Sequence, residues 1–213
     1  MDFATPLQSL APTVDAVVLS VLAGTESNLS QTQVHRLAGR GSRTGVALAL
    51  DRLAAQGVVL AEPAAYGSLF RLNRGHVLAP VVLAAQRARE EFLERMRRRC
   101  EEFPDSVVSV ALYGSVARRE AGPESDVDVL FVVEGDAADD DPEIAARIQS
   151  LETDVLAWSG NRMQPLVESD AHLERLVLSN EPIVAHWSNE ALTLHGRDLS
   201  ALIREFARQG EAK

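Results

Sequence analysis

A fold of the α/β (α+β) class is predicted by three features of this sequence of 213 residues. Apolar residues recur at helical spacing over residues 14–57, two apolar strand patterns lie between residues 107 and 133, and helix and strand patterns alternate after residue 142. With 46% hydrophobic residues and a net charge of −10, the composition suits folded domains and excludes disorder and collagen-like repeats. Cys100 is the only cysteine, so a disulfide scaffold is excluded, and no Cys/His cluster has zinc spacing.

The distribution of charge predicts three parts: residues 1–79, a connecting helix over 80–103, and residues 104–213. The third part holds 21 acidic and nine basic side chains, or a net charge of −12, whereas each of the others carries +1. A domain this acidic is a poor non-specific partner for nucleic acid, but the N-terminal part is not excluded as one. Met1–Asp15 lacks a signal-peptide pattern and no apolar run is long enough for a membrane span, so we expect a cytoplasmic protein without a membrane partner.

The N-terminal part is predicted to form three helices and a hairpin. The helices are expected at residues 14–22, 30–38 and 42–57, and the strands at 58–60 and 68–72. Ser30 is followed three residues later by Gln33, which is the pattern of a capping box, and Ser42 is a suitable N-cap for the third helix.

This order of elements resembles the winged helix-turn-helix domains of bacterial regulators. The segment SRTGVALALDRLAAQGVVLAEPAAYGSLFRLNR, residues 42–74, carries the resemblance. It implies that the helix from Ser42 enters the major groove of duplex DNA, with Arg43 and Thr44 near its leading end. Another interpretation stays open, because such domains also serve only for dimerisation or protein docking, and the turn at Pro63–Gly67 has no basic residue to contact a phosphate. The expected partner of this domain is therefore duplex DNA or a second copy of the chain in a homodimer.

Residues 80–103 are predicted to form one long helix that begins at Pro80, a residue tolerated in a first turn. Its apolar side chains share one stripe: Val81, Ala85, Ala88, Phe92 and Met96. The arginines and glutamates between them nearly cancel, which is typical of a solvated face with local ion pairs. We expect this helix to connect the two domains.

The segment VVSVALYGSVARREAGPESDVDVLFVV, residues 107–133, contains the residues best suited to chemistry. Gly114 and Ser115 form a tight turn between a strand and a short helical stretch at 116–121. Their backbone N–H groups and the serine hydroxyl offer a site for the oxygens of a phosphate. Arg118, one turn into the helical stretch, adds a charged contact to the same phosphates.

A pair of carboxylates follows on the next strand. Asp126 and Asp128 project from the same face of that strand and lie about 7 Å apart. Two such carboxylates bind divalent cations, and oxygen ligands without thiolates or paired histidines favour Mg²⁺ or Mn²⁺. Together with the phosphate site, the pair predicts a nucleoside triphosphate bound with its metal.

The Gly-Ser turn, the Ala-Arg of the short helix and the Asp-x-Asp pair together resemble the signature of the DNA polymerase β-like nucleotidyltransferase superfamily, in its minimal, small-protein form. The resemblance covers residues 104–200 and implies a mixed sheet with helices packed mainly on one side. It also implies transfer of a nucleoside monophosphate to a hydroxyl with release of pyrophosphate. Gly114 and Ser115 would hold the β- and γ-phosphates of ATP, and Asp126 and Asp128 would act as the catalytic metal ligands.

Active members of that superfamily place a third carboxylate on a neighbouring strand, where it binds metal and helps to deprotonate the acceptor. The strand predicted at residues 162–168 carries Gln164 at the aligned position, and an amide can do neither. Glu168 has the same parity but lies about 13 Å further along, so it is a third metal ligand only if the alignment is shifted or the strand is bulged. Loss of the third carboxylate is expected to slow turnover more than it weakens binding.

Two functions follow from these motifs. The first is transfer of AMP from Mg-ATP to a protein or small-molecule acceptor, and the acidic surface of residues 104–213 would suit a cationic one. The second is a DNA-binding transcriptional regulator whose degenerate nucleotidyltransferase domain senses nucleotide. In a third, plainer arrangement, the winged helix only dimerises the enzyme.

Overall fold

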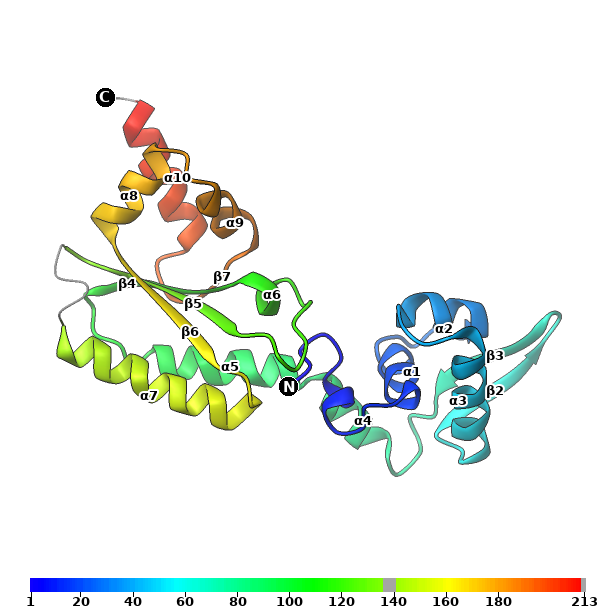
Figure 1. Ribbon diagram of the computed structural model, residues 1–213. Coiled ribbons are helices and arrows are strands. Elements are labelled where there is room, and N and C mark those ends of the chain that lie inside the picture. The colour runs from blue at the N-terminus through cyan, green and yellow to red at the C-terminus, as the bar shows by residue number, and fades with distance from the viewer. Residues whose placement is uncertain (136–140, 212–213) are drawn as a thin grey trace. The chain divides into compact units, whose positions relative to one another are not determined.

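The chain divides into two compact units in the computed structural model, which describes residues 1–135 and 141–211 (Figure 1). The N-terminal unit comprises Asp2 and Ala4–Arg89, and the C-terminal unit comprises Met1, Phe3 and the residues from Glu90 onwards. Each unit has its own buried apolar core. No helix in the described part of the chain is both long enough and apolar enough to span a membrane.

The N-terminal unit combines helices with a small antiparallel sheet of order β1-β3-β2. Its elements are η1 (Pro6–Ser9), α1 (Val14–Ala23), β1 (Leu29–Ser30), α2 (Gln31–Ala38), α3 (Arg43–Ala55), β2 (Val59–Ala64), β3 (Gly67–Leu72) and α4 (Ala79–Gln86). Ser30 and Gln33 form the expected capping box, and the Ser42 hydroxyl accepts a hydrogen bond from the N–H of Gly45 at the start of α3. The hairpin is longer than expected, because β2 and β3 stay paired out to Ala64 and Gly67.

The single helix expected over residues 80–103 is wrong, because the segment contains two helices, α4 and α5 (Ala88–Cys100). Arg87 separates them, and its N–H bonds to the carbonyl of Ala84, three residues back, as in a tightened last turn. The apolar stripe serves two cores: Val82 packs into the N-terminal unit, whereas Phe92 and Met96 pack into the C-terminal unit. A break between the helices lets each half of the stripe face its own core.

The C-terminal unit is built on a four-stranded mixed sheet of order β6-β5-β4-β7. Its strands are β4 (Val107–Tyr113), β5 (Val127–Val133), β6 (Met163–Ser169) and β7 (Leu192–Gly196). Strands β5 and β6 are parallel, and the other neighbouring pairs are antiparallel. The helices after α5 are α6 (Gly114–Ala117), α7 (Pro142–Ser159), α8 (Asp170–Leu178), α9 (Pro182–Glu190) and α10 (Leu199–Glu211).

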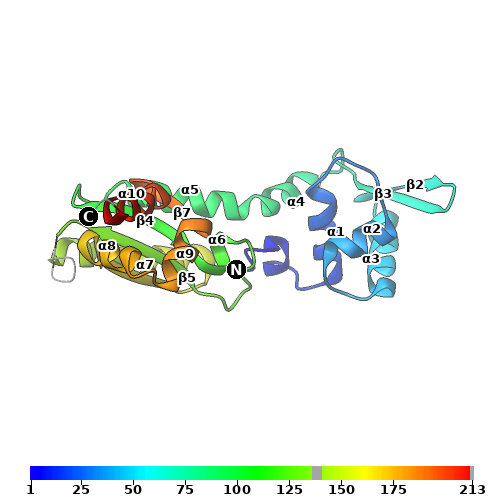
Figure 2. The same cartoon turned by 90° about the horizontal axis from the view of Figure 1, so that it is seen from above.

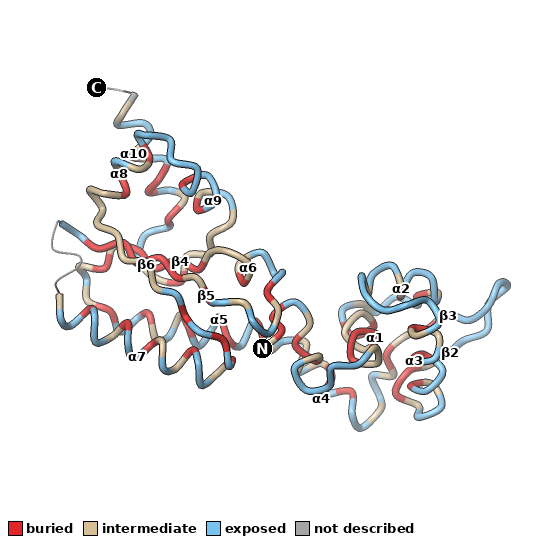
Figure 3. The backbone as a smooth tube through the Cα atoms, viewed as in Figure 1, coloured by how far each residue is buried: buried red, intermediate tan, exposed pale blue. Residues whose placement is uncertain are grey.

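Helices cover both faces of this sheet, which corrects the expectation that they pack mainly on one side. Figure 1 shows α5 and α7 on one face and α8, α9 and α10 on the other, and Figure 2 views the unit from the latter side. Strand β5 requires both layers because Val129 and Phe131 enter the core under α5 and α7, while Leu130 and Val132 enter the core under α8 to α10. Most residues of β4 and β5 are accordingly buried (Figure 3).

Two other elements of the C-terminal unit differ from the sequence expectations. The helical stretch expected at residues 116–121 is a single turn, Gly114–Ala117, and begins two residues earlier. Helices α8 and α9 were not anticipated, because each has only nine residues and mixes polar with apolar side chains. These helices matter for the site because α9 ends beside α6.

Candidate functional site

The turn between β4 and α6 brings Gly114 against a carboxylate. Tyr113, the last residue of β4, lies opposite Asp128 of β5 in the antiparallel register. Gly114 then has a positive φ of 70°, and a Cβ atom placed on it would lie 2.2 Å from Oδ2 of Asp128. A side chain at position 114 would therefore be strained and would collide with the acid. The contact explains why glycine occupies this position and joins the Gly-Ser turn to the carboxylate pair.

Ser115 follows as the second residue of the single-turn helix. Its carbonyl accepts a hydrogen bond of 2.9 Å from the backbone N–H of Glu120, and the carbonyl of Gly114 accepts one of 3.1 Å from the backbone N–H of Arg118. Within residues 1–135 and 141–211, the Ser115 hydroxyl makes no hydrogen bond. Because α6 has only one turn, an anion here would depend on individual N–H groups and this hydroxyl rather than on a long helix dipole.

Asp126 and Asp128 stand at the start of β5, where Asp126 is exposed and Asp128 is half-buried. Asp128 shares its parity with Leu130, so its side chain lies on the face of the sheet covered by α8 to α10. Partial burial and then the negative charge of Asp126 raise the pKa of Asp128, and the positive charge of Arg118 opposes them. The two carboxylates therefore repel each other, and a cation would relieve the repulsion.

The carboxylate pair fits a hard divalent cation. Among the described residues there is no cluster of three or more His, Cys, Asp or Glu side chains placed to hold a metal, so this part of the chain offers the carboxylate pair alone. Magnesium is commonly held by one or two carboxylates plus water and substrate phosphates, and the adjacent Gly-Ser turn is where such phosphates would lie. Asp126 and Asp128 are thus the residues able to hold the metal.

Gln164 lies directly beside the pair. In the parallel register of β5 and β6, Asp128 is the partner of Gln164, which is exposed. Glu168 is not brought to the site, because its partner is Val132, four residues further along β5. Its carboxylate instead contacts Nδ1 of His172 on α8. The structure thus keeps the third-ligand candidate Glu168 apart from Asp126 and Asp128 and puts an amide next to them.

Arg118 links the site to helix α9. Its guanidinium forms ion pairs of 2.9 Å with Glu120 and 2.7 Å with Glu190, the last residue of α9. Nδ1 of His186 lies 3.5 Å from the same Glu190 carboxylate. The hydrogen bond from Arg118 is the main reason that the pKa of Glu190 is lowered. Glu190 was missed at the level of sequence, because it follows Arg118 by 72 residues in an unassigned segment and no motif marks it.

Tyr113, which directly precedes the Gly-Ser turn, packs against Trp187 of α9. Their rings meet edge to face with centroids 6.1 Å apart, and Trp187 is only 1% exposed. Burial and then the nearby charge of Asp128 raise the pKa of Tyr113. Trp187 is therefore a core anchor of α9 and has no free face on which a base could stack.

The residues expected to contact DNA lie in the N-terminal unit. Arg43 is the first residue of α3, Thr44 is the second, and both are exposed. One turn further along the same helix, Leu48 is 53% exposed and Asp51 is also exposed. The exposed surface of α3 thus contains a cation, a hydroxyl, an apolar side chain and an acid.

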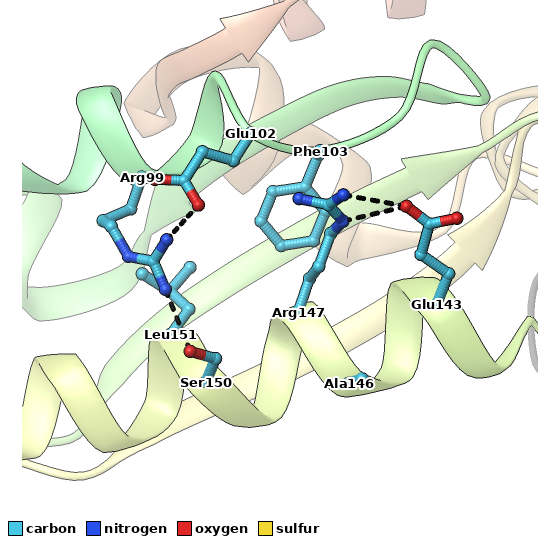
Figure 4. Close-up of a pocket in the computed structure, with 8 residues that line it drawn as sticks. All are labelled: Arg99, Glu102, Phe103, Glu143, Ala146, Arg147, Ser150 and Leu151. Carbon is cyan, nitrogen blue, oxygen red and sulfur yellow. Dashed lines mark hydrogen bonds and ion pairs between the residues drawn. The ribbon is translucent and has the colours of Figure 1, made fainter.

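A cavity of about 320 Å³ lies between α5 and α7, away from the Asp pair (Figure 4). Arg99 crosses it and bonds to Glu102 and to Ser150, while Arg147 bonds to Glu143. Phe103 and Leu151 close it with residues of the core under α5 and α7, on the face of the sheet opposite Asp128. Both guanidinium groups of this cavity have carboxylate partners.

Comparison with known proteins gives one family match. Residues 91–178 match the family model of the nucleotidyltransferase domain, and no curated protein sequence matches the chain. A crystal structure of a toxin–antitoxin with AMP-PNP aligns with 58% of this chain and 84% of its own, at 16% identity and a TM-score of 0.34. A crystal structure of a mutant toxin–antitoxin MntA-HpeT aligns with 56% and 84%, at 11% identity and a TM-score of 0.34. TM-scores this low do not establish a shared fold.

The family match covers the site. It runs from within α5 to the end of α8, and so includes the Gly-Ser turn, Asp126, Asp128 and Gln164, but not Glu190. Residues 91–178 are therefore similar to the nucleotidyltransferase domain, and the match covers less than half of the chain.

Proposed function

We propose that the C-terminal unit transfers a nucleoside monophosphate, AMP from Mg-ATP, to a hydroxyl of a protein or small-molecule acceptor. The observation that carries this proposal is the close approach of Gly114 to Asp128, which joins the Gly-Ser turn and the carboxylate pair within the segment matched to the nucleotidyltransferase domain. A phosphate site and a metal site in contact are what a metal-bound triphosphate requires.

Each residue has a distinct part in this proposal. The backbone N–H groups at Gly114 and Ser115, with the Ser115 hydroxyl, bind the β- and γ-phosphates. Arg118 contributes a guanidinium to the same phosphates, which would compete for it with the carboxylates of Glu120 and Glu190. Asp126 and Asp128 hold the divalent cation, which when bound supplies positive charge to the triphosphate.

The acceptor oxygen bonds to the α-phosphorus, the bond from that phosphorus to the β-bridging oxygen breaks, and pyrophosphate leaves. The acceptor proton must go to a base, and the Gln164 amide beside Asp128 cannot take it. The proton therefore passes to solvent or to a group of the acceptor. For this reason nucleotide binding should be retained while transfer is slow.

Incubation of the full chain with α-labelled ATP and Mg²⁺ or Mn²⁺, alone and with cell lysate, tests the proposal. The Asp126→Asn/Asp128→Asn double variant is the control. Label that moves to an acceptor with the native chain but not with the control supports a transferase, and the mass of the product identifies its target. Absence of both transfer and Mg-nucleotide binding by calorimetry would refute the proposal.

A second candidate is a transcriptional regulator whose nucleotidyltransferase domain only senses nucleotide. Gln164 favours it, since a sensor needs reversible binding without a base. The N-terminal unit would then be a winged helix-turn-helix domain, with Arg43 and Thr44 at the start of α3 contacting duplex DNA in the major groove. Salt-dependent binding to a specific duplex, weakened in Arg43→Ala, is the expected result, whereas unchanged binding would exclude this role for α3.

A third candidate is that the N-terminal unit forms a homodimer. The exposed Leu48 and Asp51 on α3 favour it, because an apolar side chain and an acid suit a protein surface better than a phosphate backbone. Sedimentation should then show a dimer that Leu48→Glu dissociates, while Arg43→Ala leaves nucleotide transfer unchanged.

A further inference from the structure

The loop that leads into Asp126 is held by one buried amide outside the Gly-Ser and Asp-x-Asp motifs. Asn161, between α7 and β6, is only 3% exposed. Its Nδ2 donates to the carbonyl oxygens of Ser125 at 2.8 Å, Pro123 at 3.2 Å and Gly122 at 3.4 Å. Three carbonyl acceptors require the NH₂ end of the amide at this place, so an asparagine fits where an acid of the same shape would meet three oxygens.

The same loop is closed on itself and tied to β6 on its other side. The Ser125 hydroxyl accepts a hydrogen bond of 3.0 Å from the N–H of Gly122. The N–H of Val127 donates to the carbonyl of Arg162 at 2.8 Å. Asp126 therefore stands between two anchored residues, Ser125 and Val127, whose partners are the consecutive residues 161 and 162.

The orientation of Asn161 is itself fixed from several directions. Gly160 ends α7 in the left-handed conformation, with φ of 74°, and turns the chain toward β6. The N–H of Asn161 bonds to the Ser159 hydroxyl at 3.1 Å, and the amide Oδ1 accepts from the amino group of Met1. A buried amide with all its groups bonded rotates little, so it can set the position of the loop rather than follow it.

We propose that Asn161 is a positioning residue for the divalent cation, acting by holding the Ser125 carbonyl and thereby the Asp126 carboxylate next to Asp128. The inference rests on the proposed metal-nucleotide function of the Asp pair and adds to it a residue from a separate part of the chain. Asp126 is exposed and makes no hydrogen bond or ion pair in residues 1–135 and 141–211, so its placement depends on the backbone on either side of it. Residues that orient metal ligands typically change metal affinity about 10–100-fold when they are replaced.

The test measures Mn²⁺ binding to the full chain by the loss of the free Mn²⁺ signal in electron paramagnetic resonance, with and without the α,β-methylene analogue of ATP. Asn161→Asp keeps the size of the side chain and its acceptor but removes the donor to the three carbonyls. Asn180→Asp is the matched control, since Asn180 is exposed and in a left-handed conformation that aspartate tolerates. Leu151→Ala, which opens the core under α7, controls for lost stability.

We expect Asn161→Asp to raise the Mn²⁺ dissociation constant about tenfold or more, and affinity for the analogue in EDTA to stay within about twofold of the native value. Folded Asn180→Asp and Leu151→Ala should bind Mn²⁺ like the native chain. Equal Mn²⁺ affinity in Asn161→Asp and Asn180→Asp would overturn the inference while leaving the proposed function intact. A native chain that binds no Mn²⁺ would overturn the proposed function and the inference together.

Ser125→Ala provides a second variant if Asn161→Asp does not fold. It keeps the Asn161 amide but removes the hydrogen bond between Ser125 and Gly122 on the other side of the same loop. A loss of Mn²⁺ affinity of about threefold or more would support a positioned loop, because the effect should be a fraction of that of Asn161. Unchanged affinity in Ser125→Ala would then count against the inference.

Discussion

Replacement of Gly114 by alanine should separate backbone strain from a collision with the metal ligand. Alanine at φ of 70° costs about 1–2 kcal/mol. Its Cβ would also lie 2.2 Å from Oδ2 of Asp128, well inside the 3.0 Å below which something must shift. Forced displacement in a packed site adds about 1–3 kcal/mol, so Gly114→Ala should lose about 2–5 kcal/mol of unfolding free energy. The displaced carboxylate should also abolish detectable Mg-nucleotide binding.

Gly135→Ala is the matched control for this substitution. Gly135 lies in the same unit with φ of 82°, and no atom of the described residues apart from its chain neighbours lies within 4 Å of a Cβ placed on it. It should therefore show only the backbone cost of about 1–2 kcal/mol and normal Mg-nucleotide affinity. Urea unfolding gives the two free energies, and calorimetry gives the two affinities. Equal destabilisation of the two variants, or intact nucleotide binding in Gly114→Ala, would refute the argument that the glycine is required by Asp128.

Four further predictions concern charges and protons in the C-terminal unit. Asp128→Asn removes the repulsion with Asp126 that helps to raise the pKa of Asp128, so without metal at pH 7 the variant should melt at or above the native temperature, and Mg²⁺ should stabilise only the native chain. Burial raises the pKa of the Cys100 thiol to about 12, so a thiol reagent at pH 8 should modify it only after unfolding. The unfolded thiol ionises first, so the contribution of this group to stability should be lost as the pH rises from about 8.5 toward that value, as urea titrations at several pH values would show. Glu190→Gln removes one carboxylate from Arg118, so metal-free ATP should bind several-fold more tightly at low salt in a fluorescence titration. Gln164→Asp adds an acid in register with Asp128, so Mn²⁺ affinity and the rate of label transfer should both rise. If neither rises, position 164 is not where the third carboxylate of an active site would lie.

Local patterns predicted most of the elements that build the site. The strands on either side of the Gly-Ser turn and strand β6 agree with the predicted segments to within a few residues. The resemblance aligned Gln164 with the third carboxylate of the superfamily, and the parallel register puts this residue opposite Asp128.

Features that depend on tertiary packing could not be predicted in this way. Two cores share one apolar stripe, so nothing in residues 80–103 reveals the break at Arg87. Asn161 looks like an ordinary helix-ending residue, and its three carbonyl partners lie 36 to 39 residues earlier in the chain. Glu190 has the same difficulty, because only the packing of α9 beside α6 brings it to Arg118.

The contact between β5 and β6 separates what this site can bind from what it can catalyse. In the proposed function, binding depends on the Gly-Ser turn, Arg118 and the Asp pair, which lie at one end of the sheet. Transfer would be faster with a proton acceptor beside Asp128, where Gln164 stands. If the native chain binds metal and nucleotide but transfers label only as Gln164→Asp, the amide is what makes the domain a sensor. If the native chain transfers label and Gln164→Asp does not increase the rate, the proton leaves by way of the acceptor or solvent. Gln164 would then be related to which acceptor is used, and not to a loss of activity.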